Sequence, residues 1–246
     1  MLGAYLGFQI IDWRGSFWLA LLIAPLAGAL LGTAIERVAL RPLYGRPAHY
    51  QMLLTFGCIL IIEEAVRAIW GLDYKEVGTP ALFAAPTHLF GATVSTYRLF
   101  FIGVGAAIAL LLFLGIERTR IGVTVRACSS GPDTVAGLGI DVNRVRCFVF
   151  AFGAGLAALA GAVTAPLFPV ELGMGFATII DCFIVIIIGG LGSISGAVVA
   201  SLLVGLVRAA GYTAAPEWVD FVTYTLLITV LLTRPQGLFG RPLRLA

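Results

Sequence analysis

Charged residues are scarce in this chain. They make up 12% of its 246 residues, while hydrophobic residues make up 60%. Soluble domains hold about 25% charged and about 45–50% apolar residues. A water-soluble fold with so few charges could not cover its surface, because exposing apolar groups to water is unfavourable. The composition therefore excludes an ordinary soluble domain and predicts that the lipid bilayer surrounds most of the chain.

Residues typical of catalytic, metal and nucleotide sites are also rare. The sequence has two histidines, and its four cysteines show no paired spacing, so neither a zinc site nor a disulfide framework is expected. It lacks the Gly-x-x-x-x-Gly-Lys-Ser/Thr phosphate loop and cannot bind and hydrolyse ATP by that route. No serine–histidine pair or carboxylate dyad indicates an enzyme. We expect no catalytic residue, cofactor, metal or nucleic acid. The start, MLGAYLGFQII, lacks the basic region of a cleavable signal peptide.

Long apolar runs fill the sequence instead. A membrane-spanning helix needs roughly 20 apolar residues, and these runs are continuous rather than alternating as in β-barrels. They predict an all-α, polytopic transmembrane helix bundle with about six to eight spans, forming a single transmembrane domain over residues 1–246. The runs are Gly15–Ile35, His49–Trp70, Leu99–Ile116, Cys147–Val170, 176–207 and Val219–Thr233.

One of these runs is longer than a single helix needs. The string GGLGSISG interrupts 176–207 at residues 189–196. Each glycine weakens a helix by about 1 kcal/mol relative to alanine, and serine side chains can satisfy the freed backbone groups. We predict a helix break on the translocation path, between two short segments of about 15 residues that suit a broken or re-entrant span. The residues assigned to this break are Gly189, Gly190, Gly192 and Ser193.

Small residues recur at every fourth position in several runs. In lipid, small faces let helix backbones approach closely, and this contact dominates helix association. Packing within or between subunits is the simpler interpretation, and lining a conduit is the alternative. The stripes are Ala20, Ala24, Gly28 and Gly32; Gly153, Ala157, Gly161 and Ala165; and Gly189, Ser193, Ala197, Ser201 and Gly205.

Arginine placement predicts the orientation. Three regions, 37–46, 118–146 and 234–244, hold 11 of the 16 basic residues. By the positive-inside rule these regions face the cytoplasm. An even number of crossings must then separate the second region from the third, which favours two passes in 176–207. The sequence thus favours seven crossings, with the first residues outside.

The polar segment 117–146 lies between two apolar runs and is too long for a plain turn; we call it the polar loop. Pro132 suits the first turn of a helix, Ser130 or Gly131 can cap it, and Gly137 or Gly139 can end it. We predict a helix of about two turns near Pro132–Leu138. An isolated helix this short is marginal in water, so it needs either its own bundle or a partner protein to hold it.

Three acids lie within or near the apolar runs. Glu63 and Glu64 precede Arg67 by four and three residues and can pair with it on one helix. Both an interfacial ion pair and guidance of a zwitterion's amino group remain open. Asp181 lies about 7.5 Å into its run at helical rise, where water can still reach it. We keep Glu63, Glu64 and Asp181 as candidate polar residues of the path.

Four strings together resemble one family, the permease subunits of bacterial and archaeal ABC importers for branched-chain amino acids. They follow one another in the family's order over nearly the whole chain. The strings are ERVALRPL at 36–43; RIGVTVRA at 120–127, followed by AGLGIDVNRV at 136–145; GGLGSISGA at 189–197; and RPQGLFGR at 234–241.

The resemblance implies a multi-pass inner-membrane permease, paired with itself or with a second permease subunit. Two cytoplasmic ABC ATPase subunits would bind its inner face, and an extracytoplasmic solute-binding protein would deliver the substrate, with 71–98 as an outer loop that includes Pro80, Pro86 and Tyr97. The helix in the polar loop would be the coupling helix. The residues assigned to ATPase coupling are Arg126, Ala127, Pro132, Ala136, Gly137, Gly139 and Ile140. Arg118 and Arg120 are expected to pair with lipid headgroups instead.

The chain departs from the family in two places. Family members usually carry a further apolar helix before the point equivalent to Met1, so one helix of the bundle is expected to be missing. Some members carry a lysine near Asp181, which leaves the substrate open among branched-chain amino acids, other amino acids, urea and amides. A channel or ion-coupled transporter for a small polar solute is the alternative function, and it would not need the polar loop.

Overall fold

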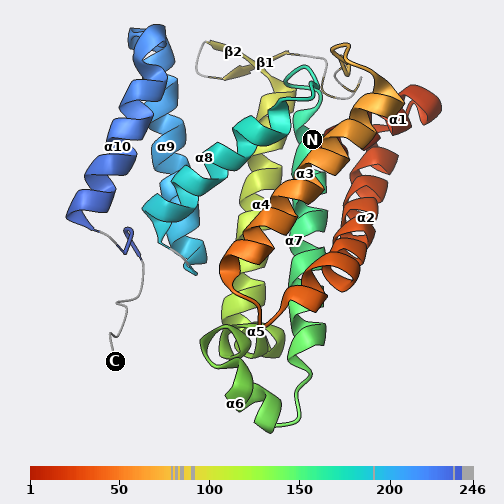
Figure 1. Cartoon of the computed structure of the whole chain (residues 1–246). Coiled ribbons are helices and arrows are strands. Elements are labelled where there is room, and N and C mark those ends of the chain that lie inside the picture. Colours follow the sequence, from red (N-terminus) through yellow and green to blue (C-terminus); the bar gives the residue numbers. More distant parts are fainter. Residues whose placement is uncertain are drawn as a thin grey trace. The chain divides into compact units, whose positions relative to one another are not determined.

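The computed structural model describes residues 1–78, 80, 83, 86–89, 92–190, 192–234 and 236–239. Helices cover most of each predicted apolar run, which confirms an all-α bundle (Figure 1). No predicted apolar run accounts for the first helix or for the hairpin. In chain order the elements are α1 (Leu2–Arg14), α2 (Phe17–Ile35), η1 (Glu36–Leu40), η2 (Arg41–Leu43), α3 (Ala48–Trp70), β1 (Pro86–Leu89), β2 (Ala92–Ser95), α4 (Thr96–Arg118), α5 (Arg120–Ser130), α6 (Pro132–Gly137), α7 (Val142–Thr164), α8 (Met174–Gly189), α9 (Ile194–Ala214), η4 (Pro216–Trp218) and α10 (Val219–Thr233).

Four helical stretches of the described chain are long and apolar enough to cross a membrane. Helix α3 is as long as α4 but carries three charges in its last third, while α8 and α10 have 16 and 15 residues. Such short helices cross only a thinned or locally deformed bilayer, and the seven crossings stay a prediction. The four stretches are Phe17–Leu43, Thr96–Arg118, Val142–Thr164 and Ile194–Ala214.

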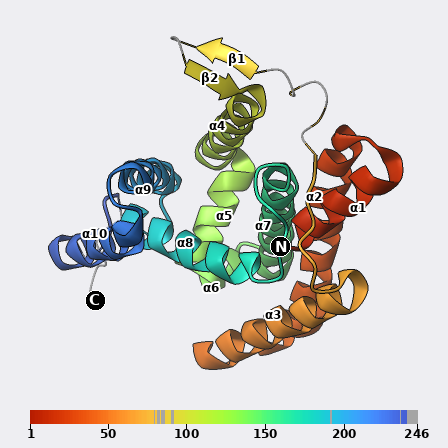
Figure 2. The same ribbon diagram turned by 90° about the horizontal axis from the view of Figure 1, so that it is seen from above.

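The chain divides into two compact units. Unit 1 holds residues 1–107 and 115–174, and unit 2 holds residues 108–114 and 175–246. In unit 1, α2 and α7 run side by side and α1 packs against both, as Figures 1 and 2 show from two directions. These three helices form the centre of the unit.

Small residues make the contact between α2 and α7. A Cβ atom added to Gly28 would lie 2.5 Å from Ala158 Cβ, and one added to Gly32 would lie 2.6 Å from Ala154 Cβ. Both are well below ordinary van der Waals contact, so only glycine lets the backbones approach this closely. The α2 stripe is therefore a packing face, as predicted.

The prediction that the α7 stripe is a packing face holds for only two of its four residues. Gly161 packs against α1, since an added Cβ would lie 2.9 Å from Ala4 N, and Ala165 is buried. Gly153 and Ala157 are exposed, and nothing lies within 4 Å of a Cβ built on Gly153. The packed face instead includes Ala154 and Ala158, one residue further along. A four-residue step drifts around a helix of 3.6 residues per turn, and the α7 stripe turns from an exposed side at Gly153 and Ala157 to the packed side at Gly161 and Ala165.

In unit 2, α8 and α9 cross closely where the first ends and the second begins. A Cβ on Gly189 would lie 2.6 Å from the Gly196 carbonyl carbon, and one on Gly196 would lie 2.1 Å from Gly189 O. Ile184, Ile188, Ala200 and Val204 form the buried cluster beside this crossing, and residues of α10 pack against it.

Candidate functional sites in the polar loop and at the glycine-rich break

The polar loop forms two helices. The predicted helix near Pro132–Leu138 is confirmed: α6 spans Pro132–Gly137, with Gly131 as N-cap and the proline in the first turn. Gly139 follows in the left-handed conformation, with φ of 82°. The preceding helix α5 was not predicted, because its apolar residues are interleaved with arginine, threonine and serine.

The chain bends sharply at Thr119 between α4 and α5, and Gly122 and Arg126 of the matched string RIGVTVRA contact the end of α4 across this turn. A Cβ on Gly122 would lie 2.0 Å from Ile116 O, so the start of α5 can approach the end of α4 this closely only with glycine there. Thr119 Oγ1 caps α5 by accepting a hydrogen bond from Gly122 N at 3.2 Å. The Arg126 guanidinium donates to the same Ile116 carbonyl. Arg126 therefore points inward and holds the turn.

One face of the loop packs inward and the other is exposed. Val135 and Cys128 are 5% and 8% exposed and anchor α6 and α5. Arg126 and Pro132 are partly buried, whereas the other five residues assigned to coupling are exposed, namely Ala127, Ala136, Gly137, Gly139 and Ile140. Large apolar side chains share this exposed surface; they are Ile121, Val123 and Leu138. We call the exposed residues of α5, α6 and 138–140 the loop face.

The end of α2 lies at the same end of α7 as the polar loop, as Figure 1 shows. Glu36 is 1% exposed and accepts a hydrogen bond from Tyr44 Oη at 3.1 Å. Burial raises the pKa of Tyr44 to about 12, and the hydrogen bond to Glu36 adds to the rise. The phenol therefore stays protonated and keeps donating to Glu36 at every physiological pH. The Arg146 guanidinium lies over the Tyr44 ring at 4.8 Å.

The glycine-rich break is where it was predicted. Helix α8 ends at Gly189 and α9 begins at Ile194. Gly190 and Gly192 have φ of 97° and 83°, values that favour glycine. Ser193 caps α9, accepting a hydrogen bond from Gly196 N at 3.0 Å. The predicted length of about 15 residues fits α8 but not α9, which has 21 residues.

Two of the matched strings meet in unit 2, which the sequence did not predict. The segment from the C-terminal string RPQGLFGR lies on the end of α8: Leu238 N donates to Ile188 O at 2.8 Å, and Phe239 N donates to Gly189 O at 3.1 Å. A Cβ on Gly237 would lie 2.5 Å from Gly190 N and Cα, and Gly237 has φ of 78°. The C-terminal segment thus satisfies carbonyls that the helix end leaves open.

Asp181 has a partner that the sequence analysis missed. Arg208 of α9 donates to both carboxylate oxygens, with Nη1–Oδ2 and Nη2–Oδ1 distances of 2.6 Å. Asp220, near the start of α10, lies 4.0 Å from Arg208 Nη2. The three charges join α8, α9 and α10. Since 27 residues separate the main pair, no local spacing pointed to it.

The acids of α3 form a weaker arrangement. Glu64 lies 3.7 Å from Arg67 Nη1, and both side chains are more than half exposed. The predicted three-residue pairing is confirmed, and such a pair contributes about 0.2–0.5 kcal/mol. Glu63 is partly buried on the same helix.

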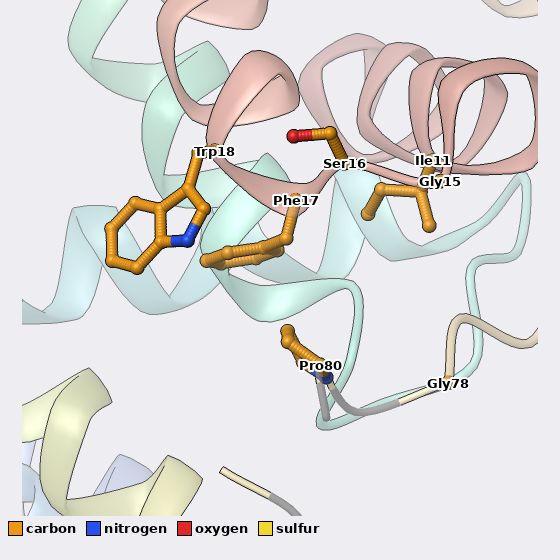
Figure 3. A pocket seen from close by; sticks show the side chains of 7 residues that line it. All are labelled: Ile11, Gly15, Ser16, Phe17, Trp18, Gly78 and Pro80. Carbon is orange, nitrogen blue, oxygen red and sulfur yellow. The ribbon is translucent and has the colours of Figure 1, made fainter. Parts of the chain in front are cut away.

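Part of the outer loop 71–98 folds into the antiparallel hairpin β1–β2. Tyr97 is fully buried and donates to Val163 O at 2.7 Å, so it holds α4 on α7 and is not part of a docking surface. Pro80 lines a cavity of about 230 Å³ with Gly78 and the α1–α2 turn, seen in Figure 3 with Phe17 and Trp18. Pro86 begins β1.

The sequence profile described as "branched-chain amino acid transport system / permease component" matches residues 1–231. The chain belongs to this family. It is 31% identical to the high-affinity branched-chain amino acid transport system permease protein BraD of Pseudomonas aeruginosa over 98% of this chain and 83% of that protein. The permease protein LivH of Escherichia coli K12 gives the same identity and coverage. The probable LivH of Methanocaldococcus jannaschii is 26% identical over 98% of this chain and 80% of that protein.

No solved structure gives a significant match to the chain. Gly122 and Arg126 of the RIGVTVRA string hold the α4–α5 turn, and residues of the GGLGSISGA and RPQGLFGR strings contact each other in unit 2.

Proposed function

We propose that this chain is the transmembrane subunit of an ATP-driven ABC importer, moving branched-chain or related amino acids across the plasma membrane of a bacterium or archaeon. Family membership supports this proposal, as do the relatives named for high-affinity branched-chain amino acid transport. Because the chain has no phosphate loop, two separate cytoplasmic ATPase subunits supply the energy. A second permease subunit and an extracytoplasmic solute-binding protein complete the transporter.

The loop face is the proposed docking surface for the ATPase subunits. It presents exposed apolar side chains such as Leu138, which is 76% exposed, outside the four candidate spans. Exposed apolar surface beside charged residues is typical of protein interaction sites. The face is also held firmly, since Val135 anchors α6 and Arg126 fixes the α4–α5 turn. A rigid docking element transmits motion of the ATPases to the helices that it joins, α4 and α7.

The translocation path is proposed at the α8–α9 break and the nearby polar residues. The close crossing of Gly189 and Gly196 gives a contact that can open or close over a short distance. Asp181 and Arg208 together offer a carboxylate and a guanidinium, the complement of a zwitterionic amino acid. Glu63 and Glu64 remain weaker candidates for the path, because Glu64 is largely exposed and pairs within its own helix.

Replacing Gly139 with tryptophan tests the coupling role. A Cβ at this position meets nothing within 4 Å, so the bulky side chain projects outward and membrane insertion stays intact. Replacing a glycine that has a positive φ with any other residue costs roughly 1–2 kcal/mol of stability. Gly45→Trp is a matched control, since Gly45 has φ of 91°, equally open surroundings and a place in the 37–46 arginine region. We expect Gly139→Trp to abolish co-purification of the ATPases and Gly45→Trp to preserve it.

If the ATPases co-purify with Gly139→Trp at wild-type yield, the coupling role of the loop face is wrong. Uptake of labelled leucine by the reconstituted transporter tests the substrate separately. Deleting the ATPase gene distinguishes the importer from a channel or ion-coupled transporter for urea or an amide, because only the importer loses all uptake.

A further inference from the structure

A cavity of about 610 Å³ lies in unit 1 between the end of α2 and the start of α7. Three arginines line it: Arg37 and Arg41 come from the continuation of α2, and Arg144 comes from the first turn of α7. Asp141 is the one acid in the lining, so the lining has a formal charge of three minus one, or +2. The excess of cations favours an anionic ligand.

The one carboxylate is already engaged. Asp141 Oδ1 caps α7 by accepting hydrogen bonds from Asn143 N at 3.0 Å and Arg144 N at 3.2 Å. Its Oδ2 lies 3.0 Å from Arg144 Nε. This pair fixes Arg144 through Nε, and Arg37 and Arg41 lie across the cavity on the other helix.

The lining changes from charged to apolar along α7. Arg144 and Cys147 are followed by Phe148 and Ala151, which lie about 6 Å and about 10 Å beyond Arg144 along the helix at 1.5 Å per residue. Phe148 is 53% exposed, and its ring stacks on that of Phe152, with centroids 6.0 Å apart. A cationic end and an apolar wall leading from it match an amphipathic anion rather than a free inorganic ion.

The position of the cavity agrees with this chemistry. The two helices that form it belong to the candidate spans Phe17–Leu43 and Val142–Thr164, and the arginines lie at the ends of those spans. Span ends lie at the level of lipid headgroups, and the positive-inside rule assigns this end to the cytoplasmic leaflet. That leaflet carries anionic lipids that attract basic residues.

We infer that this cavity binds one anionic phospholipid. The phosphate lies among Arg37, Arg41 and Arg144, whose planar guanidinium groups match phosphate oxygens in pairs. The acyl chain runs along Phe148 and Ala151 toward Phe152. The bound lipid joins the end of α2 to the start of α7, beside the polar loop.

The test measures retained lipid on the full-length chain. The protein is reconstituted in nanodiscs of equal parts phosphatidylglycerol and phosphatidylcholine, extracted in mild detergent and examined by native mass spectrometry. We expect wild type to retain one phosphatidylglycerol. Each arginine near an anionic surface contributes about a five-fold effect, so R37Q/R41Q/R144Q lowers phosphatidylglycerol affinity by about 100-fold. The single variant R41Q, with about a five-fold loss, serves if the triple variant fails to fold.

The matched control removes three arginines of the same membrane face that lie outside the cavity, R46Q/R118Q/R120Q. It should retain phosphatidylglycerol like wild type. Equal loss in the control would mean general attraction to headgroups and overturn the site. Displacement of the lipid by millimolar inorganic phosphate would assign the cavity to free phosphate instead. Unchanged lipid retention together with lost ATPase binding in the cavity variant would assign it to an acidic segment of a protein.

Discussion

The α4–α5 turn gives the most stringent prediction, because adding a single methyl group at Gly122 is incompatible with its geometry. In Gly122→Ala, the new Cβ must move from 2.0 Å to at least 3.4 Å from Ile116 O, so α5 retreats by about the difference of 1.4 Å. The Thr119 cap contributes about 1 kcal/mol, and the Arg126 bond to Ile116 O contributes about 1.5–3 kcal/mol. Losing both costs roughly 3 kcal/mol, which raises the local opening of α5 by about 100-fold.

Hydrogen–deuterium exchange of residues 119–130 measures that opening, and ATPase co-purification measures its consequence. We expect Gly122→Ala to exchange about 100-fold faster in α5 and to lose the ATPases, while inserting normally. Gly115→Ala is the matched control, since a Cβ there meets nothing within 4 Å in the same turn region. Wild-type protection of α5 in Gly122→Ala would refute the role given to this turn.

Three further predictions concern the helix contacts. Removing either partner of the Asp181–Arg208 pair, as in D181N or R208Q, should destabilise the protein by roughly 1–3 kcal/mol, less than the roughly 3–5 kcal/mol of a fully buried pair. In thermal unfolding, the double variant should recover part of this loss. Additive losses from the two substitutions would argue against the pair. Gly237→Ala should release the C-terminal segment and speed exchange at the Gly189 end of α8, and unchanged exchange would contradict that contact. Gly28→Ala should cost roughly 1–3 kcal/mol by overpacking α2 on α7, whereas Gly153→Ala should cost nothing, and equal effects would contradict the face assigned to α7.

Local signals predicted most of the helices, but not α1, α5 or the β1–β2 hairpin. Continuous apolar runs located the helices, Pro132 and the glycines around it located α6, and GGLGSISG located the break between α8 and α9. Each of these depends on backbone preferences within a few residues. The four matched strings also predicted the family that the profile and the relatives established.

Contacts between distant segments could not be predicted in the same way. Arg208 follows the apolar run 176–207 directly and had no predicted partner, and only the packing of α9 on α8 brings it to Asp181. The C-terminal string gave no sign that it lies on the glycine-rich break. Tyr97 looked like an exposed aromatic of an outer loop, yet α7 buries it. In each case the partner is chosen by tertiary packing, which composition and periodicity do not encode.

Photocross-linking from Leu138 tests the central claim most directly. A benzoylphenylalanine placed there, where the side chain is 76% exposed, should form a covalent adduct with an ATPase subunit in intact cells. The same probe at Trp13, 78% exposed beside the turn between α1 and α2 and predicted to face outside, should form none. An adduct between Leu138 and the extracytoplasmic solute-binding protein, or no ATPase adduct in an active transporter, would contradict the account.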